Sequence, residues 1–296
     1  MNNRYIHVFT DADLDGVVSY LTLSWFLNLE PPVTVTTEKE LAATYKSFSQ
    51  KNHIENFTRI YILDLDICSL AQIVDKSNFS IVDHHMGSVN CGYTFKNARY
   101  KIEKEGSTCK MLYNLLKNHY KRDLDNNKKL LISIGHDYDS YTLSNKDVSI
   151  GLNTLFWNYQ GNRLEKFVNR FREGFNGFTN EEKRIIAFYN NKVERFILES
   201  NIFTGNVAIG ANEYKISSIM ADFCINEISQ QMIDKTCSDI GIVVNSNSNS
   251  VSFRRKKGCT VNLSKLAEKL CEGGGHEAAA GGKITPVFLE FTKLLK

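Results

Sequence analysis

The sequence lacks the features of a membrane-spanning or disulfide-rich protein. No apolar run approaches the roughly eighteen residues of a membrane span, and no signal peptide precedes the first strand-like segment. The seven cysteines are odd in number and form no C-x-x-C pair, which favours reduced thiols in a cytoplasmic protein. The net charge of +3 over 296 residues is too small to indicate an extended surface for non-specific DNA binding. Internal repeats and coiled-coil heptads are also missing from the sequence.

Acidic residues are crowded near the start of the chain. Asp11, Asp13 and Asp15 lie two residues apart, directly after an apolar, strand-like run. In an extended segment this spacing places all three carboxylates on one face, where they repel one another unless a cation neutralises them. Gly16 then allows a sharp turn into a predicted helix over residues 17–29. The alternative is a solvated acidic turn, since Asp-Gly is also common in hairpins.

Two further apolar runs end in acidic residues. Residues 59–63 lead into Asp64, and a later run leads into Asp83-His84-His85. Parallel strands place their carboxyl ends along one edge of a sheet, so these side chains can converge there. Oxygen ligands with one or two imidazoles suit Mn²⁺ or Mg²⁺ better than Zn²⁺. The number of carboxylates exceeds what one ion needs, and we therefore predict a site for two metal ions.

The pattern of elements changes along the chain. Strands and helices alternate to about residue 120, and residues 127–198 are mainly helical by pattern. A β pattern resumes near Phe203, and residues 239–253 are typical of a hairpin with a polar turn. Within the alternating part, Ser107 is a plausible N-cap of a helix. We therefore expect two domains of α/β type, joined through a helical region.

The acidic motifs, taken together, resemble those of the DHH superfamily of phosphoesterases. The resemblance rests on Asp-Ala-Asp-Leu-Asp-Gly at 11–16, on Leu63-Asp64 and on Asp83-His84-His85. The fourth family motif is an Asp after a helix, for which Asp139 is the first choice and Asp137 the alternative.

The first motif departs from one form of the family pattern. Many small members have a histidine where this chain has Asp11, whereas RecJ-type members have an all-aspartate motif. His7, four residues earlier, is interpreted as a strand residue and not as a ligand.

The downstream Gly-rich segment resembles a second family domain. Residues 273–281, Gly-Gly-Gly-His-Glu-Ala-Ala-Ala-Gly, are similar to the signature of the DHHA1 domain. The resemblance therefore covers nearly the whole chain. It implies a mainly parallel sheet flanked by helices in a DHH domain over residues 1–185, a helical connector over 186–202, and a smaller α/β DHHA1 domain over 203–296, with the active site in the cleft between the two domains.

The resemblance also implies roles for the acidic motifs. The implied metal ligands are Asp11, Asp13, Asp15, Asp64, His84 and Asp139. Asp64 would bridge two Mn²⁺ ions, or Mg²⁺ ions, and a water activated between them would attack phosphorus. His85 would approach the phosphate or the leaving group, and Asp83 would orient an imidazole. Gly106-Ser107-Thr108 fits a family segment that begins a helix near the metals.

The second domain is expected to hold the substrate. Gly274 and Gly275 allow backbone amides to approach an anion, and His276 and Arg254 can add charge-assisted hydrogen bonds to a phosphate. The alternatives are a flexible glycine turn for the first pair and a solvated basic turn for residues 254–257.

These expectations lead to a function hypothesis with several alternatives. The first choice is a phosphodiesterase that hydrolyses short single-stranded RNA or DNA to mononucleotides. The alternatives are a RecJ-like exonuclease, a cyclic or linear dinucleotide phosphodiesterase, and a phosphatase for 3′-phosphorylated nucleotides. A non-enzymatic alternative is an inactive DHH scaffold that binds nucleic acid. A homodimer is possible.

Overall fold

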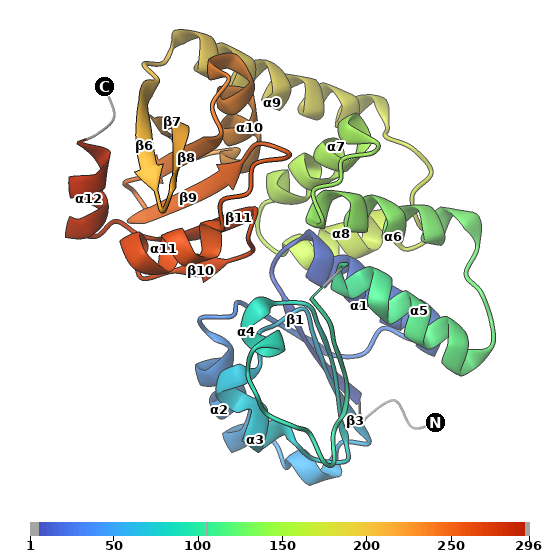
Figure 1. Ribbon diagram of the computed structural model, residues 1–296. Coiled ribbons are helices and arrows are strands. Elements are labelled where there is room, and N and C mark those ends of the chain that lie inside the picture. The colour runs from blue at the N-terminus through green and yellow to red at the C-terminus, as the bar shows by residue number, and fades with distance from the viewer. Residues whose placement is uncertain (1–5, 105, 294–296) are drawn as a thin grey trace. The chain divides into compact units, whose positions relative to one another are not determined.

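The computed structural model describes residues 6–104 and 106–293. It divides into two compact units, Met1–Lys183 and Arg184–Lys296, whose elements are labelled in Figure 1. Helix α9 (Asn180–Glu199) runs across the boundary between the units. Its start carries a reciprocal capping box, in which the Glu182 N–H donates to the Thr179 hydroxyl and the Thr179 N–H donates to the Glu182 carboxylate. Within the described residues, no helix is both long and apolar enough to cross a membrane.

The first unit contains a five-stranded sheet in the order β2-β1-β3-β4-β5. All neighbouring pairs in it are parallel, which confirms the predicted N-terminal parallel sheet. In chain order the strands are β1 (Ile6–Asp11), β2 (Val33–Thr36), β3 (Arg59–Leu63), β4 (Phe79–Asp83) and β5 (Arg99–Ile102). The Tyr5 end of the first predicted strand lies outside the described residues.

Helices cover both faces of this sheet (Figure 1). Neighbouring residues of β1 point to opposite faces, so Val8 packs in one hydrophobic cluster and Phe9 in another. The Val8 face is covered by α1 (Leu14–Leu27) and α5 (Thr108–Tyr120). Helix α6 (Asn126–Asp139) packs against both, α8 (Arg163–Phe171) packs against α1, and α7 (Lys146–Asn158) packs against α6 and α8. The Phe9 face is covered by α2 (Leu41–Lys51) and α3 (Ala71–Val74), and the short α4 (Met86–Val89) follows β4.

The second unit contains a six-stranded mixed sheet in the order β10-β11-β9-β8-β7-β6. Only the β7–β8 pair is parallel among its described strands. The strands are β6 (Phe203–Ile209), β7 (Asn212–Met220), β8 (Ile240–Asn245), β9 (Ser250–Arg255), β10 (Gly274–Gly275) and β11 (Ala279–Lys283), and the helices are α10 (Ile225–Thr236), α11 (Leu263–Cys271) and α12 (Pro286–Thr292). β8 and β9 pair antiparallel from Asn245 and Ser250 onwards, which confirms the predicted hairpin.

Candidate metal centre

The first acidic motif forms a turn from a strand into a helix. Asp11 is the last residue of β1, and Asp13 is the N-cap of α1, where its side chain accepts a hydrogen bond of 2.9 Å from the Gly16 N–H. A Cβ on Gly16 would lie 2.5 Å from the Asp11 carbonyl oxygen, so only glycine allows this close approach. Asp15, in the first helical turn, is 1% exposed. The motif is therefore neither a hairpin nor a solvated acidic turn.

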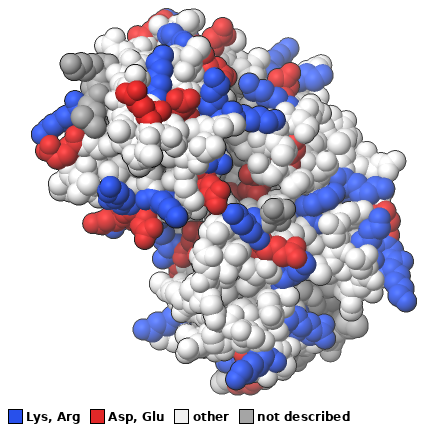
Figure 2. Space-filling model, viewed as in Figure 1, with Lys and Arg blue, Asp and Glu red and all other residues white. Residues whose placement is uncertain are grey.

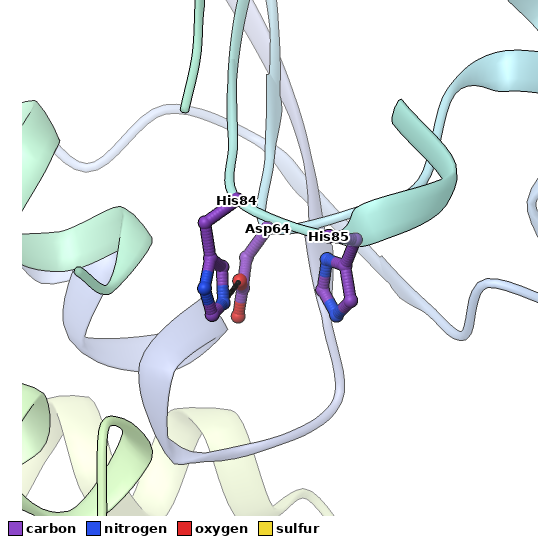
Figure 3. A group of neighbouring side chains, drawn as sticks. All are labelled: Asp64, His84 and His85. Carbon is purple, nitrogen blue, oxygen red and sulfur yellow. Dashed lines mark ion pairs between the residues drawn. The ribbon is translucent and has the colours of Figure 1, made fainter. Parts of the chain in front are cut away.

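The second and third motifs lie at the same edge of the sheet. Asp64 follows β3 with a φ of 60° and is 1% exposed, and His84 follows β4 and is 3% exposed. A non-glycine residue with positive φ is uncommon and costs free energy unless its surroundings hold it in place. Figure 3 shows the His84 ring beside the Asp64 carboxylate, with His85 on the other side at the start of α4.

His84 lies among carboxylates from three different elements. Its Nε2 atom is 3.3 Å from Asp64 Oδ1, 3.5 Å from Asp139 Oδ2 and 3.8 Å from Asp15 Oδ2. Ligand-type atoms of Asp15, His84 and Asp139 lie within 4.8 Å of one another, and so do those of Asp11, Asp13 and Asp64. A third group of this kind joins Asp64 and His84 to His85, so the six residues with implied ligand roles lie in overlapping groups.

Burial and mutual repulsion raise the pKa values of three of the clustered carboxylic acids, Asp11, Asp13 and Asp64. Burial, followed by the charge of Asp13, raises the pKa of Asp11 to about 7. Burial and the neighbouring aspartates also raise the pKa values of Asp13 and Asp64. Burial opposes the charged form of His84, but hydrogen bonding and attraction to Asp64 raise its pKa overall. Such a cluster needs positive charge to stay ionised near neutral pH.

The donor set fits divalent cations that prefer oxygen. Five aspartates supply hard oxygen ligands and His84 adds an imidazole nitrogen, which together give enough atoms for two neighbouring ions. Asp64 belongs to the group of Asp11 and Asp13 and also to the group of His84 and His85. This position suits a carboxylate that is shared between two ions.

His85 has a different environment from His84. Its Nδ1 atom is 2.7 Å from Asp83 Oδ1, and its Nε2 atom is 2.9 Å from Glu38 Oε1. Burial opposes its charged form, but the hydrogen bonds with Asp83 and Glu38 raise the pKa of His85 well above its usual value. Of the two imidazoles, the one that Asp83 contacts in this pair is that of His85. Glu38 was missed from the sequence, although its place directly after the second predicted strand was a usable signal.

The two aspartates of the fourth motif have different surroundings. Asp137 accepts hydrogen bonds from the Thr142 and Ser149 hydroxyls and from the Ser144 and Asn145 N–H groups. Both oxygens of the Asp137 carboxylate therefore hold the chain segment that follows α6. Asp139 instead lies next to His84. This arrangement supports Asp139 as the ligand in preference to Asp137.

The helix that follows β5 differs from expectation in one detail. Ser107 lies at the N-cap of α5, as predicted, but its hydroxyl makes no capping bond among the described residues. The Asp15 carboxylate accepts the bonds from the first N–H groups of this helix instead, and Ser107 interacts with His136.

The expected phosphate-binding residues of the second unit lie near one another in its sheet. Arg254 of β9 pairs with Ala279 of β11, and the His276 N–H donates to the Ala279 carbonyl. Gly274 and Gly275 form β10 on the other side of β11. Arg254 Nη2 also donates to Asn226 Oδ1 at 2.7 Å. The four predicted residues therefore lie on neighbouring strands and their connecting turn.

Part of the first unit matches a known domain family. Residues 5–135 match the model of the DHH family, N-terminal domain. This match covers the part of the chain that holds the first three acidic motifs, and it supports their resemblance to the DHH superfamily of phosphoesterases. None of the curated proteins matches the sequence.

Solved structures show the same fold along almost the whole chain. Exonuclease RecJ bound to manganese is 12% identical with a TM-score of 0.56, covering 98% of this chain and 88% of that chain. The pGpG-specific phosphodiesterase PggH from Vibrio cholerae is 14% identical with a TM-score of 0.57, covering 98% and 96%. CDC45 from Entamoeba histolytica is 11% identical with a TM-score of 0.55, covering 99% and 94%. At these identities the likeness establishes the fold.

Proposed function

We propose that this protein is a divalent-metal-dependent phosphodiesterase that hydrolyses short single-stranded oligonucleotides to mononucleotides. The observation that carries the proposal is the convergence of Asp11, Asp13, Asp15, Asp64, His84 and Asp139 at one edge of the parallel sheet. An inactive scaffold has no need for so many buried carboxylates, whose mutual repulsion costs stability. RecJ, a structural relative, was solved with manganese, which makes Mn²⁺ the first ion to test.

The residues of the centre divide into two proposed tasks. The five aspartates and His84 would hold two ions, with Asp64 shared between them. When bound, the ions supply positive charge that stabilises the developing charge on the phosphoryl oxygens, and they promote deprotonation of the attacking water. His85, held between Asp83 and Glu38, presents a cationic ring beside this centre and is suited to contact a phosphate oxygen or the leaving group.

We propose that the second unit binds the rest of the substrate. Arg254 and His276 would donate to phosphate oxygens, and Gly274 and Gly275 would present their backbone N–H groups. Lysine and arginine side chains are interspersed with acidic ones on the face shown in Figure 2, and the net charge is only +3. Both features fit a short substrate better than a long backbone track, whose binding depends on many phosphate contacts.

A linear dinucleotide is the second candidate substrate. The observation that favours it is the shared fold with the pGpG-specific phosphodiesterase, which this chain covers over 96% of its length. The same centre would cleave a single phosphodiester bond, and the difference would lie only in how much of the strand the second unit accepts.

The test is hydrolysis of 5′-labelled RNA and DNA ladders, from dinucleotides to about 24 nucleotides, with Mn²⁺ or with EDTA. A linear dinucleotide such as pGpG, a cyclic dinucleotide and a 3′-phosphorylated adenosine nucleotide are assayed beside them. We expect Mn²⁺-dependent loss of the shortest oligomers first. Shortening of long strands would indicate a RecJ-like exonuclease instead. Survival of every substrate with a fully Mn²⁺-loaded protein would contradict the proposed function.

A further inference from the structure

The N-terminus of α5 depends on a carboxylate from another helix. The Thr108 N–H donates to Asp15 Oδ2 at 2.6 Å, and the Cys109 N–H donates to Asp15 Oδ1 at 2.9 Å. Both oxygens of Asp15 are thus fixed by backbone groups 93 and 94 positions away in the sequence. A carboxylate in this position also interacts favourably with the positive end of the helix dipole.

Thr108 makes a second bond to the same centre. Its hydroxyl donates to Asp64 Oδ1 at 2.9 Å. Thr108 is completely buried, and Asp15 and Asp64 are each 1% exposed, so water does not substitute easily for these bonds. One residue therefore contacts a carboxylate that follows β1 and another that follows β3.

We propose that Thr108 is a positioning residue for the metal centre, which orients Asp15 through its backbone N–H and Asp64 through its hydroxyl. The inference rests on the proposed function, because it treats Asp15 and Asp64 as ligands. A carboxylate oxygen has more than one lone pair, so it can accept a hydrogen bond and still bind a cation. Partners of this kind fix the orientation of ligands before the metal arrives.

The chemistry of threonine suits this place. A lysine or arginine here would neutralise the carboxylates and compete with the cations. A hydroxyl and an N–H add directed hydrogen bonds without adding a net charge, so the negative charge of the cluster stays available for metal ions. The bond from Thr108 also offsets part of the repulsion between Asp64 and Asp15, which otherwise favours rotation of the two carboxylates away from each other.

The test compares Mn²⁺ affinity in variants of this residue. Thr108→Val keeps the shape and the backbone N–H but removes the hydroxyl, and Thr108→Ser keeps the hydroxyl. Titrations followed by electron paramagnetic resonance should show Mn²⁺ binding weakened about 10–100-fold in Thr108→Val and restored in Thr108→Ser. Phosphodiesterase activity of Thr108→Val should require correspondingly more Mn²⁺ and recover as Mn²⁺ is raised.

Thr22→Val is the matched control. Thr22 is also completely buried, and its hydroxyl donates to the Val18 carbonyl at 2.8 Å inside α1. The control removes the same atoms at the same burial, and we expect its Mn²⁺ affinity to equal that of the wild type. An equal loss of affinity in both variants would show that general loosening of the core, and not the bond to Asp64, affects the metals.

The possible outcomes separate this inference from the proposed function. Failure of the wild type to bind Mn²⁺ would refute the proposed function itself. Tight Mn²⁺ binding by the wild type, with unchanged affinity in Thr108→Val, would overturn only the role of Thr108. If Thr108→Val does not fold, Thr108→Ala is tested in its place. Weak Mn²⁺ binding by Thr108→Ser, which keeps the hydroxyl, would also contradict the proposed role of Thr108.

Discussion

The sheets of the two units bring residues together in different ways. In the first unit all strand pairs are parallel, so the carboxyl ends of β1, β3 and β4 lie along one edge. Ligand-type side chains from positions far apart in the sequence therefore meet there. In the second unit most pairs are antiparallel, and the glycine-rich β10 pairs with β11 across a short local turn. The first sheet therefore brings acidic side chains together at one edge. The second sheet places the side chains of Arg254 and His276 near the backbone of the glycine-rich β10.

This contrast predicts that the two units contribute to different steps. Substitutions of the acidic cluster in the first unit should change metal content and turnover, whereas substitution of His276 in the glycine-rich turn should change substrate binding and leave metal content unchanged.

The largest expected effect comes from Asp64→Ala. We expect a loss of kcat/KM of about 10³-fold or more, because in the proposed centre the Asp64 carboxylate would hold both ions. Mn²⁺ content, measured by mass spectrometry after dialysis, should fall with it. Asp147→Ala, which removes an exposed aspartate in the first turn of α7, is the control and should keep both properties. Wild-type Mn²⁺ content in Asp64→Ala would refute the shared role.

The next effect separates the two aspartates of the fourth motif. Asp139→Asn should lower turnover at least about 10²-fold and reduce bound Mn²⁺. Asp137→Asn should instead lower the free energy of unfolding by about 1–3 kcal/mol, because an amide nitrogen cannot accept the bonds from Thr142 and Ser149. Denaturant unfolding measures the free energy of unfolding of both variants, and Mn²⁺ titration measures their metal binding. If Asp137→Asn folded but lost Mn²⁺ while Asp139→Asn kept it, Asp137 and not Asp139 would be the metal ligand.

A smaller effect is expected in the second unit from His276→Ala. The loss of a charge-assisted hydrogen bond to a phosphate should raise KM about 10-fold or more, with Mn²⁺ content unchanged. Steady-state kinetics at saturating Mn²⁺ separates KM from kcat. A fall in Mn²⁺ content would contradict the division of tasks between the two units.

Substitution of two neighbouring glycines distinguishes folding from binding at the same turn. A Cβ on Gly273 would lie 1.9 Å from the Gly281 carbonyl oxygen, so Gly273→Ala should lower the free energy of unfolding by about 1–3 kcal/mol. A Cβ on Gly274 meets nothing within 4 Å among the described residues, so Gly274→Ala should change stability by less than about 0.5 kcal/mol. Thermal unfolding measures both. A raised KM in stable Gly274→Ala would support substrate contact, whereas an unchanged KM would argue against it.

The smallest predicted effect is the pH dependence caused by His7. Burial lowers the pKa of this imidazole to about 4 from 6.5, so the unfolded chain takes up its proton first as pH falls. His7 thus gives its full stability above pH 6.5, and the free energy of unfolding falls as the pH drops from 6.5 towards 4. We expect His7 to contribute about 1–2 kcal/mol to the free energy of unfolding. This is less than the whole pKa shift corresponds to, because the imidazole is not fully shielded from solvent. His7→Phe should show a shallower slope over this range than the wild type, and an equal slope would exclude His7 as the cause.

The motifs of the first unit could be predicted because their geometry is local. Asp13 and Asp15 take their places from the turn at Gly16, and Asp64 and His84 follow strands whose apolar runs are visible in the sequence. The partnership of Glu38 with His85 could not be predicted, because it joins the ends of β2 and β4. The capping of α5 by Asp15 in place of Ser107 was also beyond local rules, since a sequence shows which residue precedes a helix but not which side chain reaches it.

The sequence by itself determined the parallel sheet, the acidic residues at its strand ends and the resemblance of these motifs to a known family. Periodicity, turn chemistry and residue type are properties of positions close together in the sequence, so they can be recognised without knowing how the chain packs. Only the tertiary structure decided that Asp139 and not Asp137 lies beside His84, that His85 lies between Asp83 and Glu38, and that Thr108 contacts two carboxylates. These contacts depend on how separate elements pack, because a side chain forms its hydrogen bonds with groups that are near in space whatever their distance along the chain.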